Sequence, residues 1–379
     1  MKFLRDLFDP NKPIRLEPKG RPTGKKAVLS YLREPFLHPD AAGARGHTNW
    51  QECRAMAEAW CASGWSVEVV DRRDRRYAPP DDTSAVIDLG VNLGRWEEDL
   101  PANCHKVLHA TGAHWITQNH AEQKRLAELA ERRGVKLMPR RQNLPSRGIE
   151  SADVATVLGN DFTMDSFRFA GKPLRRVPIS SAYEFTWDEN RDFAEGGRNF
   201  LWMGSYGMVH KGLDLVLEAF ARMPDLRLTV CGRPEKEEDF WQAYRHELTG
   251  LPNITFAGWV DLGSPEFESI RRTHVAMVYP SCSEGGGGAV IHAMHAGLIP
   301  VVTREASVDT GGFGETIEAA TVEAVCASVS RLAENGPAAL AQRARASYDH
   351  ARTHHTIDVF SADYAEFLAD LLDGRVGVT

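Results

Sequence analysis

The stretch from Ser281 to Thr303 constrains the fold of this 379-residue chain most strongly. An apolar run at 275–280 precedes it, and the stretch itself holds Glu284, four consecutive glycines, a block of helix formers and a second apolar run. This order predicts a strand, a glycine loop, a helix and another strand. Such a loop lets the backbone approach a ligand closely, and the helix start offers unpaired N–H groups to an anion. The pattern therefore favours a phosphate-bearing ligand, while a plain surface turn remains the alternative.

Short apolar runs alternate with helical patterns along most of the chain, first over residues 27–158 and again over 199–303. The predicted strands are 27–32, 67–71, 85–89, 106–110, 135–138 and 154–158 in the first series, and 199–203, 226–231, 253–257, 275–280 and 299–303 in the second. Alternation of this kind predicts an α/β fold with two doubly wound parallel sheets. Two such units bind ligands in the cleft between them, at the carboxyl ends of their strands.

The boundaries of these units follow from shifts in composition. Residues 1–26 form a basic arm, with eight Lys or Arg against three Asp or Glu. An N-terminal domain is predicted over 27–182 and a C-terminal domain over 183–356, with a linker-like segment at their junction. A final helix at 357–373 is expected to pack back on the N-terminal domain.

The composition is that of a soluble globular protein, with 42% hydrophobic and 26% charged residues. A formal net charge of −7 argues against general nucleic-acid binding. Six scattered cysteines without a CxxC pair are typical of reduced thiols in the cytoplasm. No apolar run approaches 18 residues and no signal peptide is evident, so we expect a cytoplasmic protein without a membrane span.

The start of the basic arm, MKFLRDLF, allows one short amphipathic turn. One turn binds a membrane surface only weakly, so at most a peripheral contact is expected. The alternative is an arm that packs on the protein or is partly disordered.

Two motifs of the second half carry a resemblance to a known family. They are GSYGMVHKGLDLVLEAF (204–220) and PSCSEGGGGAVIHAMHAGLIPVVT (280–303), with LTVCG and NITFAGWV between them. The segment resembles the C-terminal domain of GT-B glycosyltransferases, in particular the retaining, family 4-like enzymes among the glycosyl transferases group 1. The N-terminal half resembles this family in layout only.

The resemblance implies a GT-B fold, with two Rossmann-like domains facing each other across a cleft. It also implies an enzyme of glycan biosynthesis that transfers a sugar from a UDP- or GDP-linked donor to the hydroxyl of a glycan, lipid-linked or small-molecule acceptor. Retention of the anomeric configuration is expected. No metal and no cofactor beyond the nucleotide-sugar co-substrate are expected, and the chain contains no Asp-x-Asp.

Site residues follow by position in the two motifs. Glu284 matches the glutamate that bonds hydroxyls of the donor sugar, and Lys211 matches the lysine that holds the diphosphate. The backbone of Gly286, Gly287, Gly288 and Ala289 matches the segment that faces the sugar and diphosphate, and Gly204 opens the first motif.

Two positions depart from the family pattern. Ser205 stands where an arginine usually helps the lysine neutralise the diphosphate, and Arg233 is our candidate for the missing cation. His292 stands where a glutamate usually binds the ribose. A histidine still hydrogen-bonds a diol, but its charge depends on pH, so the nucleotide preference does not carry over.

In the N-terminal half, His109 is the preferred match to a histidine that contacts the transferred sugar, and His114 is the alternative. Gly46 and the helix start at Thr48, where Gln51 completes a capping box, are expected to face the diphosphate or to serve as capping alone. The i, i+3 pair His292 and His295 lacks the further ligands that a zinc site needs, so no metal site is predicted.

Other functions remain open. A decayed, non-catalytic module that binds nucleotide-sugars is one alternative. An inverting transferase or a nucleotide-sugar epimerase on the same fold is another. A dehydrogenase is disfavoured, because no GxGxxG follows the first predicted strand.

Overall fold

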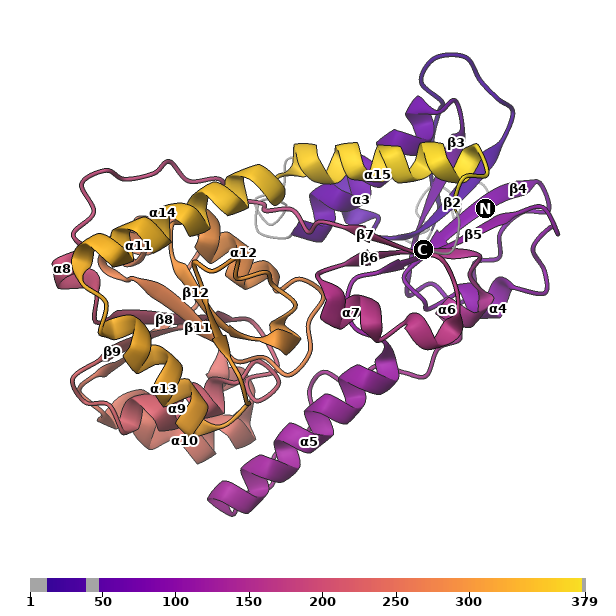
Figure 1. The fold of residues 1–379 in the computed structure, drawn as a ribbon. Coiled ribbons are helices and arrows are strands. Elements are labelled where there is room, and N and C mark those ends of the chain that lie inside the picture. The colour runs from indigo at the N-terminus through magenta and orange to yellow at the C-terminus, as the bar shows by residue number, and fades with distance from the viewer. Residues whose placement is uncertain (1–11, 39–47, 377–379) are drawn as a thin grey trace.

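The computed structural model describes residues 12–38 and 48–376, and in them the chain forms two α/β domains (Figure 1). The amphipathic turn predicted at the start of the arm lies outside these residues. Part of the predicted arm nevertheless has regular structure, because β1 (Ile14–Leu16) pairs antiparallel with β3 (Ser66–Asp71).

The first sheet has seven strands in the order β1-β3-β2-β4-β5-β6-β7, and all neighbours but β1 and β3 are parallel. Its remaining strands are β2 (Lys26–Tyr31), β4 (Thr83–Asp88), β5 (His105–Ala110), β6 (Val154–Leu158) and β7 (Leu174–Val177). The strand predicted at 135–138 is wrong. Its backbone leaves the first domain instead, and the Met138 N–H donates to Asp239 of the second domain at 2.8 Å.

The second sheet has six parallel strands in the order β10-β9-β8-β11-β12-β13. They are β8 (Asn199–Gly204), β9 (Arg227–Gly232), β10 (Ile254–Gly258), β11 (Ala276–Tyr279), β12 (Ile299–Thr303) and β13 (Glu315–Ile317). The strand order reverses direction between β8 and β11, and ligands of open α/β sheets bind at such a switch point. The two sequence motifs begin at the carboxyl ends of these two strands.

Helices cover both sheets (Figure 1). Those of the first domain are α2 (Glu34–Leu37), α3 (Thr48–Ala62), α4 (Leu93–Trp96), α5 (Trp115–Arg133), α6 (Gly148–Ser151) and α7 (Asp161–Asp165). Those that follow are α8 (Phe193–Gly196), α9 (Leu213–Ala221), α10 (Glu238–Gly250), α11 (Pro265–Thr273), α12 (Gly288–His295), α13 (Val322–Ala333), α14 (Pro337–His354) and α15 (Ile357–Leu372). None of the described helices is long and apolar enough to span a membrane.

The last helix returns to the first domain. Figure 1 shows α15 lying along α3, and Trp60 Nε1 donates to the Tyr364 hydroxyl at 3.3 Å between them. Phe360 and Tyr364 are fully buried in this contact.

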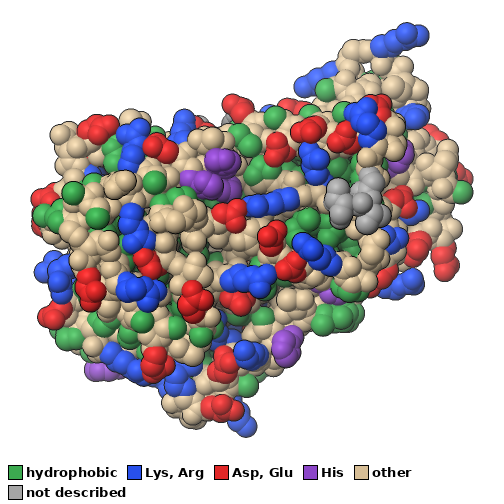
Figure 2. Space-filling model, in the orientation of Figure 1, with side chains coloured by type: hydrophobic (Ala, Val, Ile, Leu, Met, Phe, Trp, Pro, Cys, Tyr) green, Lys and Arg blue, Asp and Glu red, His purple; other side chains and the backbone are tan. Residues whose placement is uncertain are grey.

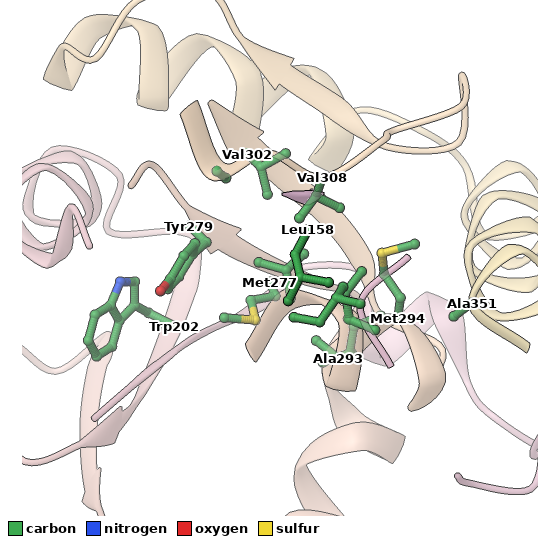
Figure 3. Close-up of a cluster of buried hydrophobic side chains, with 14 of the residues drawn as sticks. Leu158, Trp202, Met277, Tyr279, Ala293, Met294, Val302, Val308 and Ala351 are labelled. Carbon is green, nitrogen blue, oxygen red and sulfur yellow. The ribbon is translucent and has the colours of Figure 1, made fainter. Parts of the chain in front are cut away.

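Helix α5 reaches in the opposite direction, from the first domain to the helices of the second (Figure 1). Three of its arginines make the contact: Arg125 donates to the Pro280 carbonyl at 3.0 Å, Arg132 pairs with Asp214 and Glu218 at 2.8 Å each, and Arg133 pairs with Glu247 at 2.7 Å. The two domains also share an apolar core. Figure 3 shows Leu158 of β6 among Met277, Val308 and Met294 of the second domain.

The segment that joins the domains is held by α3. Glu52 accepts hydrogen bonds from the backbone N–H and the hydroxyl of Ser180, both at 2.8 Å. Gln51 donates to the Ser180 hydroxyl and the Ser181 carbonyl, at 2.9 and 2.7 Å. The side chain predicted to cap α3 therefore anchors the linker.

Because Glu52 is buried and titratable, the stability of this packing should depend on pH. Burial raises the pKa of Glu52 to about 7, above its ordinary value of 4.5, because the hydrogen bonds from Ser180 only partly offset desolvation. A carboxyl with a raised pKa lowers stability as pH rises from the unfolded value through the folded one. Glu52→Gln mimics the protonated form, so we expect it to unfold like the wild type at pH 5 but to be more stable by about 1–3 kcal/mol at pH 8.5.

Urea unfolding at the two pH values measures this difference. Glu58→Gln, at an exposed position of the same helix, is the matched control and should change stability little at either pH. An equal effect of Glu52→Gln at both pH values would contradict the raised pKa.

Candidate active site

Lys211, Tyr279 and Glu284 form a closed polar triangle at the switch point of the second sheet. The Lys211 ammonium donates to the Tyr279 hydroxyl at 2.6 Å and to Glu284 Oε1 at 3.0 Å. The Tyr279 hydroxyl donates to the same carboxylate oxygen at 2.9 Å, and the Ser281 hydroxyl does so at 3.1 Å. The structure thus brings together the two residues that the motifs predicted, at positions 73 residues apart.

Glycines place the lysine. A side-chain carbon at Gly204 would lie 3.0 Å from Lys211 Cδ, so a larger residue there would obstruct the lysine's path over the end of β8. Gly212 has φ +72° and lies against the carbonyl of Pro280. Only glycine adopts this conformation without strain, and it brings the Lys211 loop directly against the end of β11.

The site holds Glu284 as an anion. Burial by itself raises the pKa of this carboxyl, but Lys211, His210 and Arg141 lower it, with a net change from 4.5 to about 2. A depressed carboxyl pKa stabilises the fold above the unfolded value and stops doing so as pH falls toward 2. Burial and the Glu284 charge raise the pKa of Tyr279 well above 10, so its hydroxyl stays protonated as a donor.

The glycine loop lies against the first domain. A side-chain carbon at Gly285 would collide with the carbonyl of Thr111 and lie 2.6 Å from the amide nitrogen of Gly112. Gly286 has φ +97° and approaches Ile179. The glycines therefore allow backbones of two domains to touch, a role that was not predicted from the sequence.

Two helix starts meet beside this loop. Gly287, with φ +50°, precedes α12, and the half-buried Gly288 and Ala289 form its first turn. If Gly288 carried a side chain, its first carbon would lie 3.9 Å from the Thr48 methyl group and 4.0 Å from the Thr48 hydroxyl group. The N-terminal parts of α3 and α12 therefore approach each other, and the partial positive charge at a helix start attracts anions. Gly46 lies outside the described residues.

His292 contacts the linker between the domains. Its Nε2 accepts from the Ala182 N–H at 3.2 Å, and its ring meets Tyr183 edge-on, with 6.1 Å between ring centroids. The Tyr183 hydroxyl donates to Asp261 at 3.5 Å. The structure therefore places His292 beside a tyrosine and an aspartate.

Arg233 lies at the end of β9, with its guanidinium 4.5 Å from the ring centroid of Trp259, which follows β10. Trp259 is 50% exposed, and Ser205 is exposed at the end of β8. Arg233 thus packs over the Trp259 ring. The structure shows no contact between Arg233 and the triangle of Lys211, Tyr279 and Glu284.

The predicted N-terminal histidines lie away from the triangle. His109 is fully buried, with Nδ1 2.8 Å from the Thr156 hydroxyl and its ring between Tyr31 and Phe360, and burial lowers its pKa to about 4. His114 packs in a second apolar environment, against Phe167 and Phe169. Both positions are those of packed, neutral histidines, and the sugar contact stays a prediction.

His295 is likewise buried, and its Nε2 lies 3.0 Å from the His355 carbonyl. Over residues 12–38 and 48–376, no group of three or more His, Cys, Asp or Glu side chains is arranged to hold a metal ion.

Tyr279 and Arg141 were not predicted from the sequence. Tyr279 ends the apolar run before the glycine motif, so its position at a strand end was the available signal. Arg141 belongs to the first domain and follows α5, and no local pattern connects it with the second motif.

Comparisons with known proteins agree with this architecture. Residues 197–343 match a family model described as glycosyl transferases group 1. The fold is similar to that of Anabaena HepE in complex with UDP and glucose, at 12% identity and a TM-score of 0.57, over 91% of this chain and 99% of that one. It is also similar to sucrose-phosphate synthase from Thermosynechococcus elongatus, at 13% identity and a TM-score of 0.63, over 92% and 100%.

A search of curated proteins finds no match to this sequence. Identities as low as those of the two solved structures establish the fold alone. The chain has the GT-B fold, with two Rossmann-like domains built on parallel sheets, and its residues 197–343 match the model of the glycosyl transferases group 1.

Proposed function

We propose that this protein is a glycosyltransferase that moves a sugar from a nucleotide-diphosphate sugar to an acceptor hydroxyl. The observation that carries the proposal is the Lys211–Glu284 pair, fixed by Tyr279 at the switch point of a glycosyl transferases group 1 domain. A cation, an anion and two helix starts converge there.

The chemistry of each group fits this reaction. Departure of a nucleoside diphosphate builds negative charge, which the Lys211 ammonium and the N–H groups at the start of α12 stabilise. The anomeric carbon becomes electron-poor, as in glycoside hydrolysis. Glu284 is ionised, so its carboxylate accepts hydrogen bonds from the sugar hydroxyls and fixes the ring.

We further propose that transfer retains the anomeric configuration and needs no metal. Glu284 is the one carboxylate in the described triangle, and it is held as an anion by three donors rather than free to act as a base. On this proposal the leaving phosphate oxygen takes the acceptor's proton on the same face of the sugar. The protein then contributes positioning and charge stabilisation.

For the nucleotide we propose a site over Arg233, Trp259 and His292. The indole of Trp259 is half exposed, and a base that stacks on it would gain about 1–3 kcal/mol of binding free energy. The HepE structure contains UDP and glucose. UDP-linked donors are therefore our first choice and GDP-linked donors the second, with a glycan, lipid-linked or small-molecule acceptor in the cytoplasm.

A ligand-observed NMR screen of UDP- and GDP-linked sugars tests the proposal. We expect saturation transfer from the protein to one class of donor, and at least a fivefold weaker signal with Trp259→Ala. Exposed Leu144→Ala is the control substitution. Absence of binding by every donor would refute the function.

The products distinguish the alternatives that share this binding site. Incubation of the bound donor without acceptor reveals an epimerase by a changed sugar. Binding without turnover across a broad acceptor panel would indicate a non-catalytic module.

A further inference from the structure

Arg141 follows α5 in a segment that crosses from the first domain to the second. Its backbone N–H donates to both carboxylate oxygens of Glu122, at 2.8 and 3.0 Å. Its carbonyl accepts from Gln118 Nε2 at 2.5 Å. Both partners belong to α5, so the helix that bridges the domains also fixes the point from which the Arg141 side chain extends.

The side chain lies across Gly207, in the loop between Gly204 and Lys211. A side-chain carbon at Gly207 would lie 2.6 Å from Arg141 Cγ and 3.0 Å from Cδ. Gly207 also has φ +80°, which other residues rarely adopt. The missing side chain at Gly207 therefore admits an arginine of the first domain to the Lys211 loop of the second.

The charge of Arg141 lowers the pKa of Glu284, but its guanidinium makes no hydrogen bond or ion pair with a described residue. No hydrogen bond or ion pair joins it to residues 12–38 or 48–376, and its Nε is buried without an acceptor. The Nε of the neighbouring Arg140 also lacks a hydrogen bond, but the guanidinium of Arg140 pairs with Asp239 at 2.5 Å. A buried donor without an acceptor costs free energy, which a bound anion would recover.

The charges around the loop leave room for an anion. Lys211 is paired with Glu284 at 3.0 Å, so this pair has no net charge. Position 205 is an exposed serine, and Arg233 lies over Trp259 instead. A diphosphate carries more than one negative charge, so Lys211 alone does not balance it.

The face drawn in Figure 2 does not supply this balance. Figure 2 shows Lys and Arg interspersed with Asp and Glu over the described part of one face, and the chain has a net charge of −7. No broad positive patch is visible on that face, so we look to individual cations at the loop for the charge that would balance an anion.

We propose that Arg141 binds the diphosphate of the donor together with Lys211, reaching it from the opposite domain. The inference rests on the proposed function and adds a residue that the motifs do not contain. Because Arg141 comes from the first domain and Lys211 from the second, the diphosphate links the two domains directly. A planar guanidinium also suits two phosphate oxygens at once.

Titration calorimetry with UDP and with uridine tests this assignment, with GDP and guanosine in parallel. Arg141→Gln should weaken UDP binding by about 10- to 100-fold, because a charge-assisted hydrogen bond is lost. Uridine, which lacks phosphate, should bind the variant and the wild type equally. Arg147→Gln, in the same segment with 73% side-chain exposure, is the matched control and should bind UDP like the wild type.

The outcomes separate the two proposals. If the wild type binds UDP or GDP and Arg141→Gln binds it equally well, the role of Arg141 is refuted and the proposed function stands. If the wild type binds neither nucleotide, the proposed function fails and this inference fails with it.

A second variant checks the role of charge. Ser205→Arg in the Arg141→Gln background places a cation on the same loop from the second domain, so it should restore at least part of the UDP affinity. A complete lack of recovery would overturn the charge argument. Thermal unfolding of each variant confirms that the fold persists.

Discussion

Lys211→Ala and Glu284→Ala are each expected to reduce sugar transfer by about 100- to 1,000-fold, because each removes a group that stabilises the transition state or orients the sugar. The fold should survive. Each variant leaves its partner's charge unpaired at 12% side-chain exposure, which costs about 1–3 kcal/mol of stability but disrupts no apolar core.

The measurement is kcat/KM with the donor that the binding screen identifies, together with circular dichroism of each variant. Glu284→Gln keeps the shape of the side chain and one acceptor, so it should retain more activity than Glu284→Ala. Lys236→Ala, at an exposed position of the same domain, should leave turnover unchanged. Full activity of both Lys211→Ala and Glu284→Ala would show that the active site lies elsewhere.

Arg132→Ala is expected to lower the free energy of unfolding by about 3 kcal/mol. Arg132 is the α5 side chain that pairs with both Asp214 and Glu218, and the Asp214 side chain is fully buried. Burial raises the pKa of Asp214, and the nearby arginines lower it. Without Arg132, the buried Asp214 carboxylate loses its ion-pair partner. Such a loss costs more stability than the loss of a solvent-exposed ion pair.

Urea unfolding followed by tryptophan fluorescence measures this cost. Lys124→Ala on the same helix is the control, because its pair with Glu128 is 3.5 Å long and solvent-exposed and should contribute about 0–0.5 kcal/mol. Arg132→Ala should also expose α5 to proteolysis before global unfolding. Equal stability of the two variants would mean that α5 is held by its apolar contacts alone.

Local sequence patterns predicted much of the fold. The runs at 199–203, 275–280 and 299–303 became β8, β11 and β12, because continuous apolar residues suit strands covered on both faces. The GT-B architecture, which the resemblance of the two motifs implied, is confirmed by the structural comparisons. The run at 135–138 failed because hydrogen bonding to Asp239 draws its backbone toward the other domain, which a local pattern does not report.

Lys211 and Glu284 were assigned from two motifs that resemble those of a known family, and the structure brings the two side chains together. Their roles in binding the donor stay predictions. The position of Arg141 and the burial of His109 under Phe360 depend on how distant segments meet. Spacing along the chain contains no information on such contacts, so they required the structure.

The contact between Gly285 and the Thr111–Gly112 backbone has a kinetic consequence. Atoms of the first domain lie directly against the loop that follows Glu284, so on the proposed function we expect a donor sugar to enter after the domains separate. Separation must break the arginine contacts of α5, which makes it a discrete conformational step rather than a side-chain movement. The frequency of this opening then sets an upper limit on turnover, however fast the bond-making step becomes.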